Sequence, residues 1–226
     1  MTFQPLSWRP AAVLFDLDGT LIDSAPDLAA AAEKMRSDRN LPLLGAAAYR
    51  HMTGAGARGL LEVAFGSTPQ ELEFEGLKKE FLNNYESMLL QRTRPFEGVD
   101  ALLLALQRHN LPWGIVTNKA ERFTLPLVAQ LPLLAPAAVV IGGDTTAHAK
   151  PHPEPLLEAA RRLGVDAVQC VYVGDDERDV IAGKAAGMKT VAACYGYLGK
   201  QGDATGWNAD HLIDCPTDLL KWLALP

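Results

Sequence analysis

The sequence predicts an α/β protein in which a doubly wound, Rossmann-like parallel sheet carries an all-helical segment inserted after its first strand. Short apolar runs bounded by turn residues recur along the chain, as buried parallel strands do. From about residue 95 onward, helical patterns that end in Gly or Pro separate these runs. Such alternation of strand and helix is typical of a doubly wound sheet.

The first expected strand, 11–15, ends abruptly in an acidic segment. Residues 24–94 then show helical periodicity without a convincing strand, so residues 1–23 and 95–226 are expected to form the sheet domain and 24–94 a helical domain. The helices expected in the insertion are 27–36, 46–52, 59–65 and 70–90. The later strands are expected at 113–117, 138–141, 170–174 and 190–193, and helices between them at 101–109, 153–163 and 178–186.

Composition narrows the class of protein. The chain has 226 residues, of which 48% are hydrophobic and 21% charged, a balance typical of folded globular proteins. Its net charge of −6 provides no basic field for nucleic acid or an anionic membrane surface. Three cysteines without metal-binding spacing, no secretory leader and no apolar run of about 18 residues lead us to expect a cytoplasmic protein that does not span a membrane.

Polar residues follow the expected strands at their carboxyl ends, where ligands bind in open α/β sheets. They are Asp16, Asp18, Thr117, Asn118, Asp175, Asp176 and Asp179, together with Lys150 from a later loop. Gathered carboxylates require a cation, and all-oxygen ligands favour Mg²⁺. Protein-bound Mg²⁺ typically takes a phosphate oxygen as a ligand, so the sequence predicts a site for a phosphorylated small molecule.

Four segments, in this order and spacing, resemble the motifs of the haloacid dehalogenase superfamily. They are Asp16-Leu-Asp18-Gly-Thr20, Val116-Thr117-Asn118, Lys150-Pro151 and Gly174-Asp175-Asp-Glu-Arg-Asp179. The helical insertion is similar to the cap domain of the phosphoglycolate phosphatase branch, so the resemblance spans nearly the whole chain. One such motif would be weak evidence, but four on successive strand ends are specific.

The resemblance implies a phosphomonoesterase that uses Mg²⁺. Asp16 would be the nucleophile and form an aspartyl-phosphate, and Asp18 would be the general acid. Thr117 and Lys150 would stabilise charge on the phosphoryl oxygens. Asp16, the backbone carbonyl of Asp18 and Asp175 would bind the metal ion.

Further roles follow from the same resemblance. Thr20 and Asn118 would contribute to substrate binding, and Asp179 would orient the metal ligands or Lys150. Many relatives have Gly-Asp-Ser where this chain has Gly174-Asp175-Asp176, so Asp176 either contacts a metal-bound water or is an ordinary first-turn helix acid. Arg58, in a Gly-rich segment of the insertion, is expected either to bind a substrate carboxylate or to lie on the surface.

Several of these residues also fit ordinary structural roles. Asp16 and Asp18 alone could mark a turn, and Thr117 could cap a helix. The four histidines considered, His51, His109, His148 and His152, show no spacing that indicates a metal site.

Two substrates remain open, namely phosphoglycolate and N-acetylmuramic acid 6-phosphate. Both carry a carboxylate, and several segments, Tyr195-Gly-Tyr197 among them, are especially similar to the phosphatases of the second compound. A phosphomutase or a dehalogenase on the same fold is an alternative, and so is a non-catalytic binding module, although both Asp16 and Asp18 are present. A monomer or a homodimer is expected.

Overall fold

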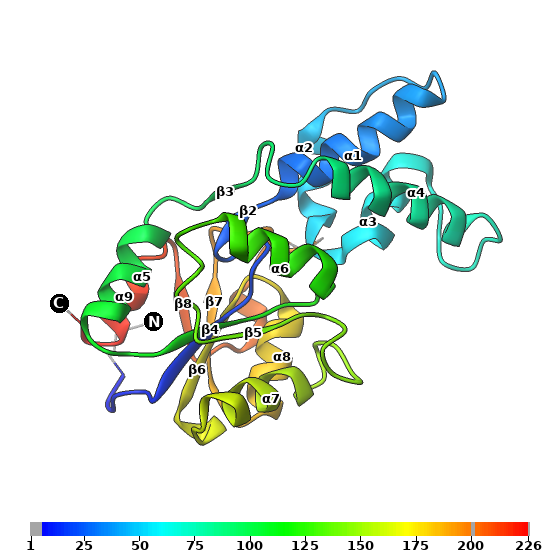
Figure 1. The fold of residues 1–226 in the computed structure, drawn as a ribbon. Helices are drawn as coiled ribbons and strands as arrows, with labels where there is room; N and C mark the ends of the chain where they lie inside the picture. The colour runs from blue at the N-terminus through cyan, green and yellow to red at the C-terminus, as the bar shows by residue number, and fades with distance from the viewer. Residues whose placement is uncertain (1–5, 200–201, 226) are drawn as a thin grey trace.

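The computed structural model describes residues 6–199 and 202–225. A six-stranded sheet forms its centre in the order β5-β4-β1-β6-β7-β8, and every neighbouring pair is parallel. The strands are β1 (Ala12–Phe15), β4 (Trp113–Val116), β5 (Val139–Ile141), β6 (Cys170–Gly174), β7 (Lys189–Ala193) and β8 (His211–Ile213). Helices cover both faces of this sheet (Figure 1). The predicted doubly wound α/β fold is confirmed.

Both faces of the sheet are buried, which explains why its strands are continuous apolar runs. Val13 and Phe15 of β1 pack in one hydrophobic cluster, whereas Ala12 and Leu14 pack in another, because successive side chains of a strand point to opposite faces. Residues of three helices complete the first cluster: α5 (Val99–Arg108), α6 (Glu121–Gln130) and α9 (Asp218–Trp222). Residues of two helices complete the second: α7 (Glu154–Leu163) and α8 (Glu177–Ala185).

Three elements of the sheet domain were not expected from the sequence. Helix α6 contains Pro126, which removes a helical hydrogen-bond donor and disguises the pattern. Strand β8 has only three residues, and α9 has five. Two short 3₁₀ helices, η2 (Ala167–Gln169) and η3 (Thr205–Trp207), directly precede β6 and β8 in the chain order.

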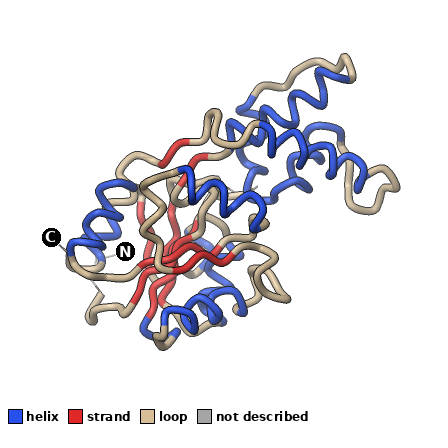
Figure 2. The backbone as a smooth tube through the Cα atoms, in the orientation of Figure 1, coloured by secondary structure: helices blue, strands red, loops and turns tan. Residues whose placement is uncertain are grey.

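Residues 24–94, named the cap segment here, form helices without a strand of the main sheet (Figure 2). The helices are α1 (Ala25–Asp38), α2 (Ala46–Tyr49), η1 (Arg50–Ala55), α3 (Gly56–Phe65) and α4 (Phe74–Ser87). They share a hydrophobic cluster that includes Met35, Leu60 and Phe81, and Phe123 of α6 packs into the same cluster. The helix expected at 70–90 is shorter at both ends, and the one expected at 46–52 changes to 3₁₀ geometry after Tyr49. Treating the cap segment as a separate domain remains a prediction.

The chain enters and leaves the cap segment through one small ribbon. Strand β2 (Ile22–Asp23) pairs antiparallel with β3 (Arg94–Pro95), with Ile22 opposite Pro95 and Asp23 opposite Arg94. The ribbon is tied to α1 because Asp27, which is buried, accepts hydrogen bonds from the backbone N–H groups of residues 92 and 93. The two crossings of the chain are therefore held together.

The sheet brings the predicted chemical residues to one edge. Strand β1 lies between β4 and β6, with Phe15 in register with Ile115 on one side and Val173 on the other. The residues that follow these strands, Asp16, Thr117 and Asp175, therefore emerge side by side. Across the described ranges 6–199 and 202–225, no helix has the length and hydropathy needed to cross a membrane.

Candidate active site

Three buried carboxylates meet at the carboxyl ends of β1 and β6. One oxygen each from Asp16, Asp175 and Asp179 lie within 4.8 Å of one another. Asp16 and Asp175 directly follow their strands, and Asp179 lies in the first turn of α8. Oxygen atoms at this separation can share one cation, so the structure offers a ligand set for a metal ion.

Lys150 is the cation of this group. Its Nζ lies 2.9 Å from Asp16 Oδ1 and 2.7 Å from Asp179 Oδ1, and it also donates to Tyr172 Oη at 2.7 Å and to the carbonyl oxygen of Val116 at 3.0 Å. The Lys150 side chain is only 3% exposed. Burial disfavours its charge, but the carboxylates of Asp16 and Asp179 outweigh burial and raise the pKa of Lys150. Lys150 is therefore a fixed positive charge beside Asp16.

The three carboxyl groups outnumber the one ammonium group, so their charged forms are disfavoured. Burial raises the pKa of Asp16 to about 6, although Lys150 partly offsets it, and the charge of Asp179 adds to the rise. Burial, followed by the charges of Asp16 and Asp179, raises the pKa of Asp175 well above its ordinary value. Three buried acids next to one ammonium group fit a hard divalent cation, which would offset their mutual repulsion.

Asp175 is held rigidly by the segment that follows β7. Its Oδ2 accepts a hydrogen bond from the Tyr197 backbone N–H at 2.8 Å, and its Oδ1 accepts one from Thr20 Oγ1 at 3.0 Å. A Cβ on Gly196 would lie 2.2 Å from the Asp175 Cβ, and one on Gly19, whose φ is +92°, would lie 2.1 Å from Asp175 Oδ2. Only glycine permits this close approach at either position.

Thr20 therefore contacts Asp175 and does not face the space that a substrate could occupy. The side chain is fully buried and does not line the cavity described below. Its predicted part in substrate binding receives no support from this placement. Thr20 instead orients a candidate metal ligand.

Asp18 forms a second ion pair with a lysine that sequence reasoning missed. Lys119 Nζ lies 2.9 Å and 3.1 Å from the two carboxylate oxygens of Asp18, and Ser24 Oγ donates a short hydrogen bond to the same group. The Lys119 ammonium also lies over the ring of Tyr85 in α4, 4.7 Å from its centre. Lys119 follows Thr117 and Asn118 directly, so its position after β4 was the available signal.

We expect Lys119→Met to lower kcat by about 10-fold to 100-fold, because an unheld Asp18 loses part of the 10²- to 10⁴-fold that a positioned general acid contributes. KM should change less, since the replacement keeps most of the side-chain volume. Lys184→Met, the same change at an exposed lysine of α8, is the matched control and should retain wild-type kcat. Steady-state phosphate release at several pH values tests this, and an unchanged kcat in Lys119→Met would contradict the positioning role.

The first turn of α8 orders the remaining acids. Asp176 caps the helix and accepts from the Arg178 backbone N–H, while Asp179 accepts from the Asp176 backbone N–H, so the two form a capping box. Asp176 also pairs with the Arg178 guanidinium at 2.7 Å. Burial alone would raise the pKa of Asp176, but its hydrogen bonds and ion pair with Arg178 outweigh burial and lower that pKa. Arg178 in turn donates to the Gly54 carbonyl oxygen of the cap segment at 2.5 Å. Asp176 thus caps α8 and pairs with Arg178, and it also lines the cavity described below, so both roles expected for it remain predictions.

Thr117 and Asn118 both border the site. Thr117 Oγ1 accepts from the Lys119 backbone N–H at 3.2 Å, but α6 begins only at Glu121, so Thr117 is not its N-cap. Asn118 holds the backbone of Lys150 with two hydrogen bonds of 2.9 Å, one to its N–H and one to its C=O. Asn118 therefore positions the segment that carries the buried lysine.

A cavity of about 560 Å³ lies between the cap segment and the sheet domain. Asp16, Asp18, Thr117, Asn118, Lys150 and Asp175 are among its lining residues. Apolar side chains form another part of the lining: Leu28, Phe81, Leu82, Tyr85 and Phe123. Lys78 and Arg122 also line it, and neither was singled out from the sequence. The carboxylates thus face a cavity whose lining is apolar in another part.

Arg58 does not line this cavity. It borders a neighbouring cavity of about 450 Å³, together with His51, Glu62 and Ser67. The expected contact between Arg58 and a substrate carboxylate beside Asp16 is not supported by this placement. Two other cations line the cavity that holds Asp16: Lys78 comes from α4 of the cap segment, and Arg122 comes from α6.

Comparison with known proteins decides the family. Residues 13–193, well over half of the chain, match the family model of haloacid dehalogenase-like hydrolases. The chain belongs to this family of haloacid dehalogenase-like hydrolases. The match includes all four predicted segments and the cap segment of this hydrolase.

Relatives of this haloacid dehalogenase-like hydrolase cover nearly its whole length. A phosphoglycolate phosphatase of Xanthomonas campestris pv. campestris is 48% identical over 96% of this chain and 98% of its own. An N-acetylmuramic acid 6-phosphate phosphatase of Pseudomonas aeruginosa is 39% identical over 95% of each chain. The crystal structure of a predicted phosphoglycolate phosphatase from Haemophilus somnus is similar with a TM-score of 0.83, at 28% identity, covering 95% of this chain and 98% of that one.

Proposed function

We propose that the protein is a magnesium-dependent phosphomonoesterase that acts on a small phosphorylated metabolite. The observation that carries the proposal is the meeting of Asp16, Asp175 and Asp179 with Lys150 in the lining of one cavity. Its membership in the hydrolase family and the phosphatase names of its relatives support the same reaction. Cytoplasmic location and a monomeric or homodimeric state remain predictions.

Asp16, the carbonyl oxygen of Asp18 and Asp175 would hold Mg²⁺, as their oxygen chemistry suits this ion. When bound, Mg²⁺ offsets negative charge on the carboxylates and on the phosphate group. Asp179 is better placed to hold Lys150, because its Oδ1 lies 2.7 Å from that ammonium and its Oδ2 accepts from the Asp176 N–H.

Asp16 would attack phosphorus with a carboxylate oxygen, forming a P–O bond while the ester P–O bond breaks. Asp18 would give its proton to the leaving alkoxide. In the second half, Asp18 would take a proton from the attacking water, and the bond between phosphorus and Asp16 would break to release inorganic phosphate. Lys150 and Thr117 would stabilise charge on the phosphoryl oxygens throughout.

Phosphoglycolate is the first candidate substrate, since relatives with 48% identity carry that name. N-acetylmuramic acid 6-phosphate is the second, and the cavity favours it. Cavities of about 300–1,000 Å³ hold ligands of drug size, so a two-carbon acid would fill only a small part of the 560 Å³ available. The apolar wall of Phe81 and Tyr85 suits a sugar ring with its acetyl group, and Lys78 or Arg122 suits its lactyl carboxylate.

The test is phosphate release from both compounds, with glucose 6-phosphate as a sugar phosphate that lacks the carboxylate. With Mg²⁺ present, a kcat/KM at least about 10-fold higher for one of the two acids than for glucose 6-phosphate supports an acid-reading phosphatase. Chelating the metal ion should abolish release. The proposal fails if no phosphoester is hydrolysed with Mg²⁺, or if activity survives complete metal removal.

A further inference from the structure

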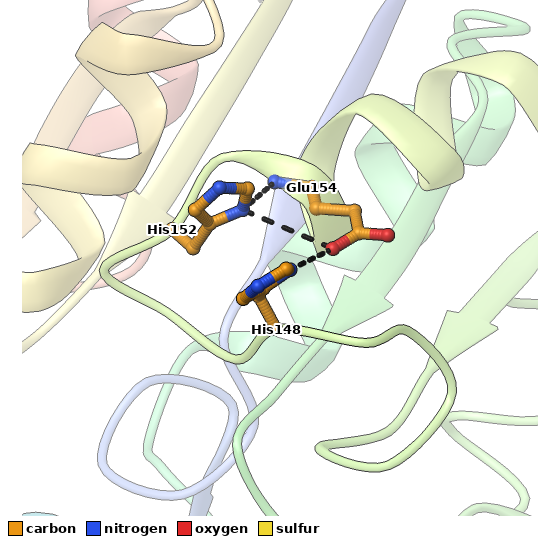
Figure 3. A group of neighbouring side chains, drawn as sticks. All are labelled: His148, His152 and Glu154. Carbon is orange, nitrogen blue, oxygen red and sulfur yellow. Dashed lines mark hydrogen bonds and ion pairs between the residues drawn. The ribbon is translucent and has the colours of Figure 1, made fainter.

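Two histidines and a glutamate meet on the surface beside the Lys150 segment, a feature that the sequence pattern did not suggest. Figure 3 shows His148, His152 and Glu154 with their polar atoms turned toward one another. His148 Nδ1 lies 2.7 Å from Glu154 Oε2, and His152 Nδ1 lies 3.9 Å from the same oxygen. The two rings stack with their centres 4.4 Å apart. These three residues are named the histidine cluster here.

We propose that the histidine cluster is a binding site for a transition-metal ion such as Zn²⁺, separate from the carboxylate site. Imidazole nitrogen and carboxylate oxygen are usual zinc ligands, and a set of two His and one Glu leaves a fourth position for water. Mg²⁺, in contrast, prefers oxygen ligands only. The chemistry of the ligands therefore separates this site from that formed by Asp16 and Asp175.

The distances fit one ion. Two ligand atoms that each lie about 2.1 Å from a zinc ion cannot be more than about 4.2 Å apart. Both separations to Glu154 Oε2, 2.7 Å and 3.9 Å, fall within this limit. One ligand atom from each of the three residues lies within 4.8 Å of the others.

The hydrogen bonds show how the ligands would become available. His152 Nδ1 accepts a hydrogen bond from the Glu154 backbone N–H at 3.2 Å, so this nitrogen is unprotonated, and a metal ion bound to it would replace that hydrogen bond. His148 Nδ1 faces the Glu154 carboxylate and gives up its proton when a metal ion replaces it. The side chains of His148 and His152 are 62% and 49% exposed, so an ion reaches them from solvent without rearrangement of the core.

The site has a structural consequence because Lys150 lies midway between the two histidines in the sequence. Asn118 already holds the backbone N–H and C=O of Lys150 from the inner side. A metal ion bound by His148 and His152 would fix the same segment from its outer side. Binding would therefore stabilise the segment that carries Lys150, and this inference does not require the phosphatase activity.

The test measures Zn²⁺ binding to metal-free protein by equilibrium dialysis, with excess Mg²⁺ present to occupy the carboxylate site. Wild type and His51→Gln, which changes an exposed histidine of the cap segment, should bind one more Zn²⁺ than His148→Gln, His152→Gln or Glu154→Gln. Loss of one ligand should weaken this binding by at least about 10-fold. Zn²⁺ should also raise the thermal midpoint of wild type and His51→Gln more than that of the cluster variants.

Equal Zn²⁺ binding by all five proteins would overturn the proposal. So would a zinc-soaked crystal of wild type whose anomalous density lacks a peak among the three side chains. Phosphate release with Mg²⁺ is expected to stay at the wild-type level in the cluster variants, because none of the three residues lines the cavity that holds Asp16. Failure of the phosphatase proposal would leave these binding results unaffected.

Discussion

Asp16→Asn is expected to lower kcat for phosphate release by about 10⁴-fold or more, the scale seen when a catalytic nucleophile is removed. The amide has nearly the same shape as the carboxylate, but its nitrogen and carbonyl oxygen are poor nucleophiles toward phosphorus. Steady-state and single-turnover assays with Mg²⁺ measure the loss. Asp38→Asn, the same chemical change at an exposed site of α1, should leave kcat unchanged.

The Asp16→Asn substitution should also raise the stability of the metal-free protein at neutral pH. Burial raises the pKa of Asp16 to about 6, so the folded protein favours the neutral form. The free energy of unfolding is therefore highest below the ordinary pKa of aspartate and falls as the pH rises through the folded-state pKa of Asp16. Asparagine does not ionise, so the variant does not lose this stability. Thermal melts at pH 7 should show a higher midpoint for Asp16→Asn without Mg²⁺, and the advantage should shrink when Mg²⁺ is added. Full activity in Asp16→Asn would rule out the covalent role.

Lys150→Met should damage both folding and activity. It leaves Asp16 and Asp179 without their shared ammonium partner, and breaking a buried ion pair costs about 3–5 kcal/mol. For a chain of this size, each kcal/mol lowers the thermal midpoint by about 2–4 °C. Mg²⁺ should recover part of this stability, because it offsets charge on Asp16.

Activity should not recover with it. Loss of one group that stabilises transition-state charge costs about 10²- to 10³-fold in kcat. Lys184→Met, which changes an exposed lysine of α8, is the matched control and should match wild type in melting and in turnover. A Lys150→Met protein that melts and turns over like this control would show that the buried cation has neither role.

The strands of the sheet could be predicted from the sequence because burial on both faces produces continuous apolar runs. Strands β1, β4 and β6 are continuous apolar runs, and each ends in a polar residue of the site. Short or interrupted elements show no recognisable hydrophobic pattern, because β8 has only three residues and α6 contains a proline. The ribbon of β2 and β3 has two residues per strand, too few to show any periodicity.

Residues on strand ends were predictable, whereas contacts made by long side chains were not. Asp16 and Asp175 follow apolar runs, so their convergence follows from sheet topology alone. Lys119 reaches Asp18 across the site, and Arg58 turns into a different cavity, because loops and cap packing decide where these side chains point. The histidine cluster depends on the fold of a loop, which spacing in the sequence does not reveal.

The paired strands at the base of the cap segment act as a single strap. Since Ile22 and Asp23 are bonded to Pro95 and Arg94, the two chain crossings cannot bend independently. The ribbon also lies next to the general-acid candidate, because Asp18 forms a β-bridge with Ile22. The backbone that carries Asp18 is therefore fixed to the same short ribbon that joins the cap segment to the sheet domain.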